Sequence, residues 1–186
     1  MNEAPYIQTV SGINFTFTEP KSEDFNIVDI AHSLGMQCRF NGHTRRFYSV
    51  AEHCLNVARL LPREFKLEGL LHDASEAYIT DIATPVKRLL PDYARLEAIV
   101  QGSVRKVFNL PEQESPEVVQ ADRACLVAEA KKYLPITRDH WIYADRYKSI
   151  YELEEKYVVG WLPEIATNLF LLRYDQYMKG IYTDAS

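Results

Sequence analysis

The sequence has few cysteines, no long apolar run and no excess of positive charge. Its three cysteines, Cys38, Cys54 and Cys125, are scattered and form no CxxC pair. Neither a disulfide framework nor a zinc site built from thiolates is therefore expected. No apolar stretch reaches the length of a membrane span, and residues 1–18 lack the basic start and apolar core of a secretory signal. These absences predict a cytoplasmic protein with no membrane partner.

The charge balance excludes a general nucleic-acid surface. Lys and Arg number 21 against 26 Asp and Glu, which gives a formal net charge of −5, whereas polymer binding normally requires a basic stripe. A single nucleotide remains compatible, because a few local basic side chains can receive its phosphates. With 186 residues, 47% of them hydrophobic, and no repeat or low-complexity tract, the chain is expected to form one domain over 1–186.

The pattern of apolar residues predicts an all-α fold with a short N-terminal hairpin. Alternating residues on either side of Ser11-Gly12 favour a hairpin that acts as a flap or an edge and not as a sheet core. Helices are expected over residues 27–37, 49–61, 67–78, 92–108 and from 116 onward, and helix-compatible sequence continues after Pro135 to about 181, interrupted near 160–163.

Local signals set the ends of several of these helices. Ser49 and Glu52 form the pattern of a capping box, Asp92 is an expected N-cap, and Ser115 precedes a proline at the first helical position. Apolar residues at helical spacing predict one continuous helix through Leu67, Leu70, Leu71, Ala74, Ala77 and Tyr78. On that helix His72 and Glu76 are four residues apart and would share a face.

Four side chains on these predicted helices suggest a metal site. His53, the adjacent pair His72 and Asp73, and the distant Asp122 offer two imidazoles and two carboxylates. Such a set suits one divalent transition metal, Zn²⁺, Co²⁺, Mn²⁺ or Fe²⁺, and leaves positions for water and a phosphate oxygen. Taken singly, each could equally be a core histidine, a helix cap or a surface charge. Together they point to hydrolysis, because a metal can neutralise a phosphate oxygen and activate water.

The surrounding sequence resembles a known enzyme family. The segments SVAEH (49–53), GLLHDASEAYITDIATPVK (69–87) and QADRACL (120–126) resemble the HD-domain phosphohydrolases. Within that superfamily they are most similar to the small deoxynucleotide phosphohydrolases, which include 5′-deoxynucleotidases and phage dATP triphosphohydrolases. The resemblance runs from about Arg39 to Leu126 and implies an HD-domain helical bundle with a deoxynucleotide substrate.

The resemblance also implies roles for individual residues. Glu76 matches the glutamate that positions or deprotonates the attacking water, with a solvated helix carboxylate as the alternative. Asp81 matches an aspartate that either donates a proton to the leaving group or contacts the sugar, and a turn-forming Asp is nearly as good an interpretation. Arg39 would clamp phosphate and Phe40, where Trp is common, would stack on the base.

Further substrate contacts are expected around these residues. Gly42 would leave space near the base edge, so that a β-branched residue there would narrow the base pocket. Phosphate contacts are expected from Arg45, Arg46 and Lys87, the last with Pro85 in the TPVK segment, although each charge could be solvated instead. His43 would reach the phosphates or organise its own loop, and His32 and His140 are assigned to structure.

Two classes of function compete at this point. The first is a deoxynucleotide phosphohydrolase, with a dNTP, dATP-like, cut to deoxynucleoside and triphosphate, or a dNMP as the alternative substrate; additional Mg²⁺ could accompany the phosphates. Several basic residues beyond Arg39 favour the dNTP. The second is a regulatory HD module that binds metal without turnover, which the retention of Glu76 and Asp81 disfavours. The absence of a Gly-Tyr-Pro signature disfavours cyclic-dinucleotide cleavage. A homo-oligomer is expected.

Overall fold

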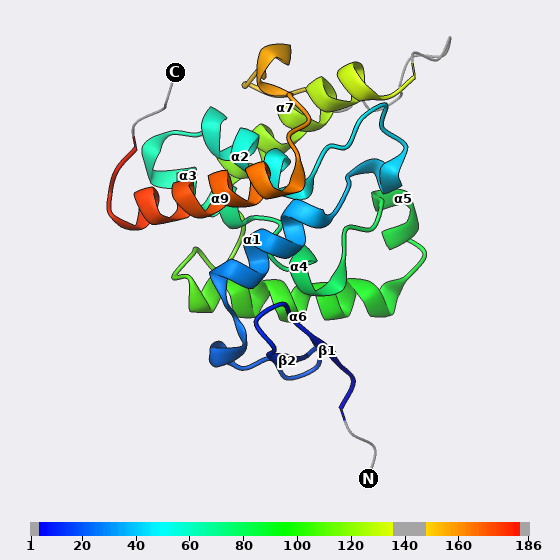
Figure 1. The fold of residues 1–186 in the computed structure, drawn as a ribbon, viewed down its shortest axis with the longest axis vertical. Coiled ribbons are helices and arrows are strands. Elements are labelled where there is room, and N and C mark those ends of the chain that lie inside the picture. Colours follow the sequence, from blue (N-terminus) through cyan, green and yellow to red (C-terminus); the bar gives the residue numbers. More distant parts are fainter. Residues whose placement is uncertain (1–3, 136–147, 183–186) are drawn as a thin grey trace.

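The computed structural model describes residues 4–135 and 148–182 and is mostly helical (Figure 1). Its helices are α1 (Ile27–Met36), α2 (Val50–Leu60), α3 (Lys66–Leu71), α4 (Glu76–Ile79), α5 (Thr84–Lys87), α6 (Pro91–Val107), α7 (Pro116–Tyr133) and α9 (Pro163–Met178). Short 3-10 turns lie at Ser22–Asp24, Phe40–Gly42, Arg63–Phe65 and Glu155–Tyr157. Within the two described ranges, no helix combines the length and apolarity needed to cross a membrane. The predicted helical class is confirmed. His140, which the sequence assigns to a structural role, lies outside the described residues.

Helix α2 forms the centre of the fold. Residues 50–58 are all buried, and α2 packs against α1, α3, α7 and α9. Its side chains contribute to two apolar clusters, one shared with α1 and α9 and the other with α7. A helix buried on all sides can carry polar groups only where each finds a partner. His53 on this helix is therefore held in a rigid, dry environment.

The capping box predicted for α2 is only half formed. Ser49 is the N-cap, and its hydroxyl accepts a hydrogen bond from the backbone N–H of Glu52. The Glu52 carboxylate, however, turns away and accepts the backbone N–H groups of Val159, Gly160 and Trp161 at 2.7–2.9 Å. Glu52 thus ties α2 to the segment that precedes α9, a tertiary role that outweighs the local one.

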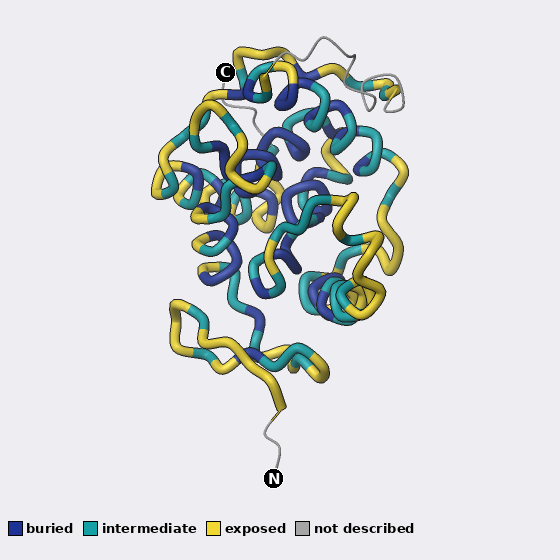
Figure 2. Tube along the Cα trace, turned by 90° about the vertical axis from the view of Figure 1, so that its right-hand side faces the viewer, coloured by how far each residue is buried: buried dark blue, intermediate teal, exposed yellow. Residues whose placement is uncertain are grey.

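The N-terminal hairpin is more than a flap. Strand β1 (Tyr6–Gln8) pairs antiparallel with β2 (Asn14–Thr16), as predicted, and most of the hairpin is exposed (Figure 2). Phe15 is the exception: it is fully buried, and its ring stacks on Tyr78 with the centroids 3.9 Å apart. The hairpin is therefore a mostly exposed edge and not a sheet core, as predicted, but one side chain of β2 is part of the main core.

The predicted helix over 67–78 is broken in two at the His-Asp pair. Between α3 and α4 the hydrogen bonds span three residues, from Ala74 N to the carbonyl of Leu71 and from Glu76 N to that of Asp73. The Gln101 side chain of α6 stabilises the break by donating to the His72 carbonyl and accepting from Ser75 N. A turn this tight keeps the apolar spacing nearly helical, which explains why the sequence pattern did not reveal it. His72 and Glu76 therefore do not share one helix.

Two further predictions concern the starts of α6 and α7. Asp92 is not the N-cap of α6, since Leu90 holds that position and Asp92 lies in the first turn. Ser115 is the N-cap of α7, but its hydroxyl donates to Glu68 and not to its own helix.

A close contact between helices positions the His-Asp turn. Gly69 of α3 lies against Ala58 of α2 and against Leu61, which directly follows α2, and a Cβ atom at this position would clash with the Leu61 side chain. Because glycine allows the two helices to approach, α3 delivers His72 next to His53.

Candidate metal centre and adjoining pocket

The four predicted metal ligands converge from three separate parts of the chain. His53 comes from α2, His72 and Asp73 from the turn after α3, and Asp122 from α7. His53 Nε2 lies 3.1 Å from Asp122 Oδ1 and 3.3 Å from His72 Nε2. Asp73 Oδ2 is 3.2 Å from His72 Nε2 and 3.6 Å from His53 Nε2. The ligand atoms of His53, His72 and Asp122 all lie within 4.8 Å of one another, close enough to hold one ion, and Asp73 adjoins both histidines.

Hydrogen bonds behind the two histidines determine which ring nitrogens face each other. His72 Nδ1 is 2.8 Å from the Gly69 carbonyl, and His53 Nδ1 is 2.7 Å from a Glu129 carboxylate oxygen. Both partners only accept hydrogen bonds, so each Nδ1 carries a hydrogen, and Nε2 of each ring presents a lone pair whenever the ring is neutral. The two Nε2 atoms and two carboxylates thus lie near one another. Either protons on Nε2 or a bound cation can satisfy such a cluster.

The charges around this point are strongly coupled. Burial alone would lower the pKa of His53 and His72, but the surrounding carboxylates more than offset this and raise both. Burial alone would likewise raise the pKa of Asp73 and Asp122, whereas the neighbouring imidazoles lower both. The carboxylates are therefore ionised at neutral pH, and the cluster attracts positive charge.

Two thiols lie beside the candidate ligands. Cys54 and Cys125 lie close enough to the histidines to form alternative groups of ligands. Burial raises the pKa of Cys54 to about 11 and also raises that of Cys125. Both thiols would therefore have to lose a proton before they bind a metal, whereas Asp73 and Asp122 are already ionised. All three cysteines are free, as predicted.

A cavity of about 350 Å³ opens directly onto Asp73 and Asp122. Its other lining residues include Arg39, Phe40, Asn41, Glu76, Asp81, Ile82, Ala83, Thr84, Pro85, Lys87, Leu126 and Leu134. Six residues proposed from the sequence for catalysis or substrate binding are thus gathered around one hollow beside the metal ligands. The walls combine apolar surface with carboxylates and two basic side chains.

Glu76 is the buried carboxylate of this cavity. It is only 5% exposed, and its Oε2 atom is buried without a hydrogen-bond partner among the described residues. Burial, together with Asp73 and Asp81, raises its pKa well above the ordinary value, and Lys87 and Arg39 partly counteract this. Lys87 Nζ lies 3.4 Å from Glu76 Oε1 and 2.5 Å from Glu97 Oε1. Glu76 is thus a carboxylate whose affinity for a proton is increased, as a general base requires.

Comparison with known proteins identifies relatives of this chain. Over 126 residues it is 44% identical to YfdR of Escherichia coli strain K12, an alignment that covers 68% of this chain and 71% of YfdR. The chain belongs to the YfdR family. It is also 34% identical over 132 residues to RCAP_rcc00048 of Rhodobacter capsulatus, covering 66% of this chain and 67% of that protein. Both relatives carry the description "uncharacterized protein". No model of a protein family matches the chain.

Four residues predicted for substrate binding do not line the cavity of this YfdR-family protein. Gly42, His43, Arg45 and Arg46 are all exposed and lie in the loop that leads away from Phe40. Gly42 has a φ of +76°, and a Cβ atom there would meet nothing within 4 Å. A β-branched residue at this position would strain the turn, and would not narrow a base pocket as the sequence suggested.

Glu129 is the site residue that the sequence did not indicate. It is fully buried on α7 and contacts His53, Tyr48 and Arg39. Its spacing of seven residues from Asp122 places both side chains on the same face of the helix. This spacing from Asp122 is the sequence signal that could have pointed to Glu129 as a buried partner of His53.

The segment between Glu76 and Asp81 contains a strained residue. Thr80 has φ +70° and ψ 153°, a conformation rare for β-branched residues. Its hydroxyl donates to Gln37 Oε1 at 3.1 Å, and its carbonyl accepts from Tyr93 at 2.6 Å. Gln37 Oε1 also accepts from Asp81 N at 3.0 Å. These contacts maintain the strained conformation of Thr80 and fix the position of Asp81 at the edge of the cavity.

This strain predicts an unusual order of stability at position 80. Thr80→Gly should have a larger free energy of unfolding than Thr80→Ala, by about 1 kcal/mol, because only glycine tolerates a positive φ without cost. At positions with a negative φ, the alanine variant is normally the more stable of the two. Urea unfolding of the two variants measures the difference, and an alanine variant at least as stable as the glycine variant would show that Thr80 is not strained.

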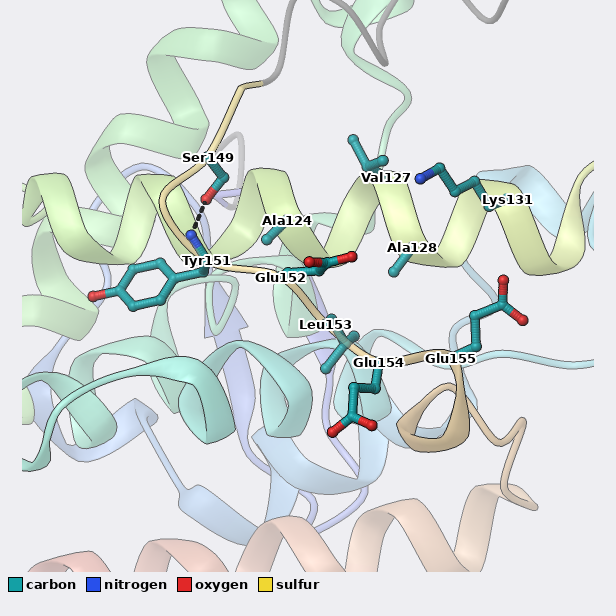
Figure 3. Close-up of a pocket in the computed structure, with 10 residues that line it drawn as sticks. All are labelled: Ala124, Val127, Ala128, Lys131, Ser149, Tyr151, Glu152, Leu153, Glu154 and Glu155. Atoms are coloured by element: carbon teal, nitrogen blue, oxygen red, sulfur yellow. Dashed lines mark hydrogen bonds between the residues drawn. The ribbon is translucent and has the colours of Figure 1, made fainter.

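A second hollow lies between α7 and residues 149–155 (Figure 3). Its volume is about 210 Å³, and Glu152, Glu154 and Glu155 line it together with Lys131. Ala124 and Ala128 of α7 face this side, whereas Asp122 and Glu129 face the histidines, in keeping with helical periodicity. None of the predicted site residues lies in this second hollow.

Proposed function

We propose that this YfdR-family protein is a metal-dependent phosphohydrolase that acts on 2′-deoxynucleotides. The observation that carries the proposal is the convergence of two imidazole lone pairs and two carboxylates beside a cavity. Such mixed nitrogen and oxygen sets bind Zn²⁺, Mn²⁺, Fe²⁺ or Co²⁺. The deoxynucleotide part rests on the resemblance of residues 69–87 to deoxynucleotide phosphohydrolases.

Each lining residue then has a defined task. A metal held by His53, His72, Asp73 and Asp122 would supply Lewis acidity, which lowers the pKa of a water molecule and neutralises a phosphate oxygen. Glu76 would accept the proton of the attacking water through its free Oε2. Asp81 would donate a proton to the leaving oxygen or hold the sugar. Arg39 and Lys87 would bind phosphate, and Phe40 would stack on the base.

The charge of the cavity favours a monophosphate substrate. Among the described lining residues, Arg39 and Lys87 face four carboxylates, and both are already paired with acidic groups. Arg45 and Arg46, which favoured a dNTP in the sequence, lie outside the lining. A triphosphate brings more negative charge than these two cations can balance. We therefore place hydrolysis of a dNMP to deoxynucleoside and phosphate first, and dNTP hydrolysis with release of triphosphate second.

The substrate experiment separates these possibilities directly. The protein is loaded with Mn²⁺ or Co²⁺ and incubated with each dNMP, each dNTP and the matching ribonucleotides, and the products are identified by chromatography. Inorganic phosphate from dNMPs is the expected result. Deoxynucleoside plus triphosphate would establish the second candidate, and metal binding without any turnover would indicate a regulatory module.

Phe40 offers a test of base recognition. Phe40→Ala should raise KM on the order of 10- to 100-fold, since stacking on one aromatic ring contributes about 1–3 kcal/mol. The differences in kcat/KM between dAMP, dGMP and dCMP should also shrink. Arg39→Met provides the comparison, because it should weaken the binding of all nucleotides to the same extent. An unchanged order of base preference in the Phe40 variant would exclude stacking by this ring.

A further inference from the structure

Glu129 connects two residues that have separate tasks in the proposed function. Its Oε1 atom lies 2.7 Å from His53 Nδ1 and accepts a hydrogen bond from the Tyr48 hydroxyl at 2.8 Å. Its Oε2 atom lies 3.1 Å from Arg39 Nε. The Glu129 side chain is 0% exposed, so these groups, and not solvent, determine its orientation.

The contact with His53 decides whether that histidine can be a ligand. A buried imidazole with no acceptor at Nδ1 could carry its hydrogen on either nitrogen. The Glu129 carboxylate binds the hydrogen at Nδ1, so Nε2 presents its lone pair to Asp122 and His72. The corresponding acceptor for His72 is a main-chain carbonyl, Gly69 O. The tautomer of His53 therefore depends on a side chain, whereas the tautomer of His72 depends on the main chain.

The contact with Arg39 orients the guanidinium toward the cavity. While Nε faces Glu129, Nη1 of the same group lies 3.7 Å from Asp73 Oδ2, beside the metal ligands. Arg39 is itself 9% exposed and lines the cavity. A buried cation this close to the site requires a counter-charge, and Glu129 supplies it from the side away from the substrate.

From this geometry we infer that Glu129 is a positioning residue that holds the metal-binding tautomer of His53 and aims Arg39 at the substrate phosphate. The inference rests on the proposed function for the role of Arg39, whereas the role toward His53 requires only a metal site. Tyr48 supports the carboxylate and is in turn held by Asn56, whose amide donates to the Tyr48 hydroxyl at 3.1 Å.

The test compares Glu129→Gln with the wild-type chain. Glutamine carries no charge and has only one acceptor oxygen, so it cannot both accept from Nδ1–H of His53 and supply the counter-charge that lies 3.1 Å from Arg39 Nε. Glu129→Gln should lower the affinity for Mn²⁺ or Co²⁺, measured by calorimetry, on the order of 10- to 100-fold, the usual effect of losing such a partner. Two-bond ¹H–¹⁵N spectra should show a smaller fraction of His53 with its hydrogen on Nδ1. KM for the dNMP should rise.

Matched variants separate positioning from a merely structural role. Tyr48→Phe removes one hydrogen bond from Glu129 but leaves its charge and its contacts with His53 and Arg39, so metal affinity should fall less than in Glu129→Gln. Glu129→Asp keeps the charge but retracts the oxygens, and it provides the same test if the glutamine variant does not fold: its metal affinity should fall. The double variant Arg39→Met/Glu129→Gln removes both charges and should remain as weak in metal binding as Glu129→Gln.

Two results would overturn the inference. One is unchanged metal affinity and tautomer in folded Glu129→Gln or Glu129→Asp protein, which would leave Glu129 with a structural role alone. The other is recovery of wild-type metal affinity in the double variant, which would reduce Glu129 to a counter-charge for Arg39. Both readouts are independent of turnover. Failure of the proposed function would show instead as absence of nucleotide hydrolysis by wild-type protein with metal bound.

Discussion

Asp73→Asn is expected to abolish phosphate release and to remove most of the bound metal. Asp73 Oδ2 lies within 3.2–3.7 Å of His72, His53 and Arg39, and an amide of the same size lacks the charge that attracts a cation to this point. Because loss of a mere supporting partner already costs 10- to 100-fold, loss of a ligand should lower kcat/KM by more than about 100-fold. Metal content by mass spectrometry and kcat/KM measure the two effects.

Asp29→Asn is the matched control for this variant. Asp29 is a buried aspartate that binds Ser11 next to the hairpin with both oxygens and does not line the cavity. Its asparagine variant should lose stability while keeping its bound metal. If Asp73→Asn retained full metal content and turnover, Asp73 would not be a ligand.

Glu76→Gln should separate catalysis from metal binding. The variant is expected to retain metal and a KM close to that of the wild type, while kcat falls by about two or more orders of magnitude, the usual effect of removing a positioned general base. The reason is that glutamine preserves the shape of the side chain but cannot take a proton from water. Steady-state kinetics on the preferred nucleotide, together with metal analysis, measure both parts.

Glu97→Gln is the control for Glu76, since both carboxylates contact Lys87 but only Glu76 lines the cavity. Its kcat should stay close to the wild-type value. Equal losses in the two variants would show that the ion pair with Lys87 matters more than proton transfer. An unchanged kcat in Glu76→Gln would return Glu76 to a purely structural role.

The sequence predicted that the four candidate ligands converge because their positions depend on local signals. The N-cap at Ser49 and the proline at the start of α7 set the registers that bring His53 and Asp122 inward. The His-Asp turn was harder to predict. Its tight hydrogen bonds keep the apolar spacing of a helix, and the Gln101 side chain that stabilises it comes from a distant helix.

Other features depend on contacts that no local pattern contains. Glu52 satisfies a capping pattern, yet its carboxylate binds main-chain groups more than 100 residues away. In the sequence, Glu129 cannot be distinguished from a solvated helix carboxylate. Its role follows only from its contacts with Tyr48, His53 and Arg39 in the fold. The basic residues at 45 and 46 are adjacent to Phe40 in sequence, but the loop carries them outside the cavity lining. Proximity in sequence to Phe40 therefore did not predict a place in the cavity lining.

The central claim is that His53, His72, Asp73 and Asp122 bind one divalent metal. Crystals grown with Mn²⁺ or Co²⁺, with diffraction data collected at the absorption edge of that metal, test it most directly. The account predicts one anomalous peak within coordination distance of both Nε2 atoms and both carboxylates. No peak there, or a peak only in the acidic hollow beside Glu152 and Glu155, would contradict it.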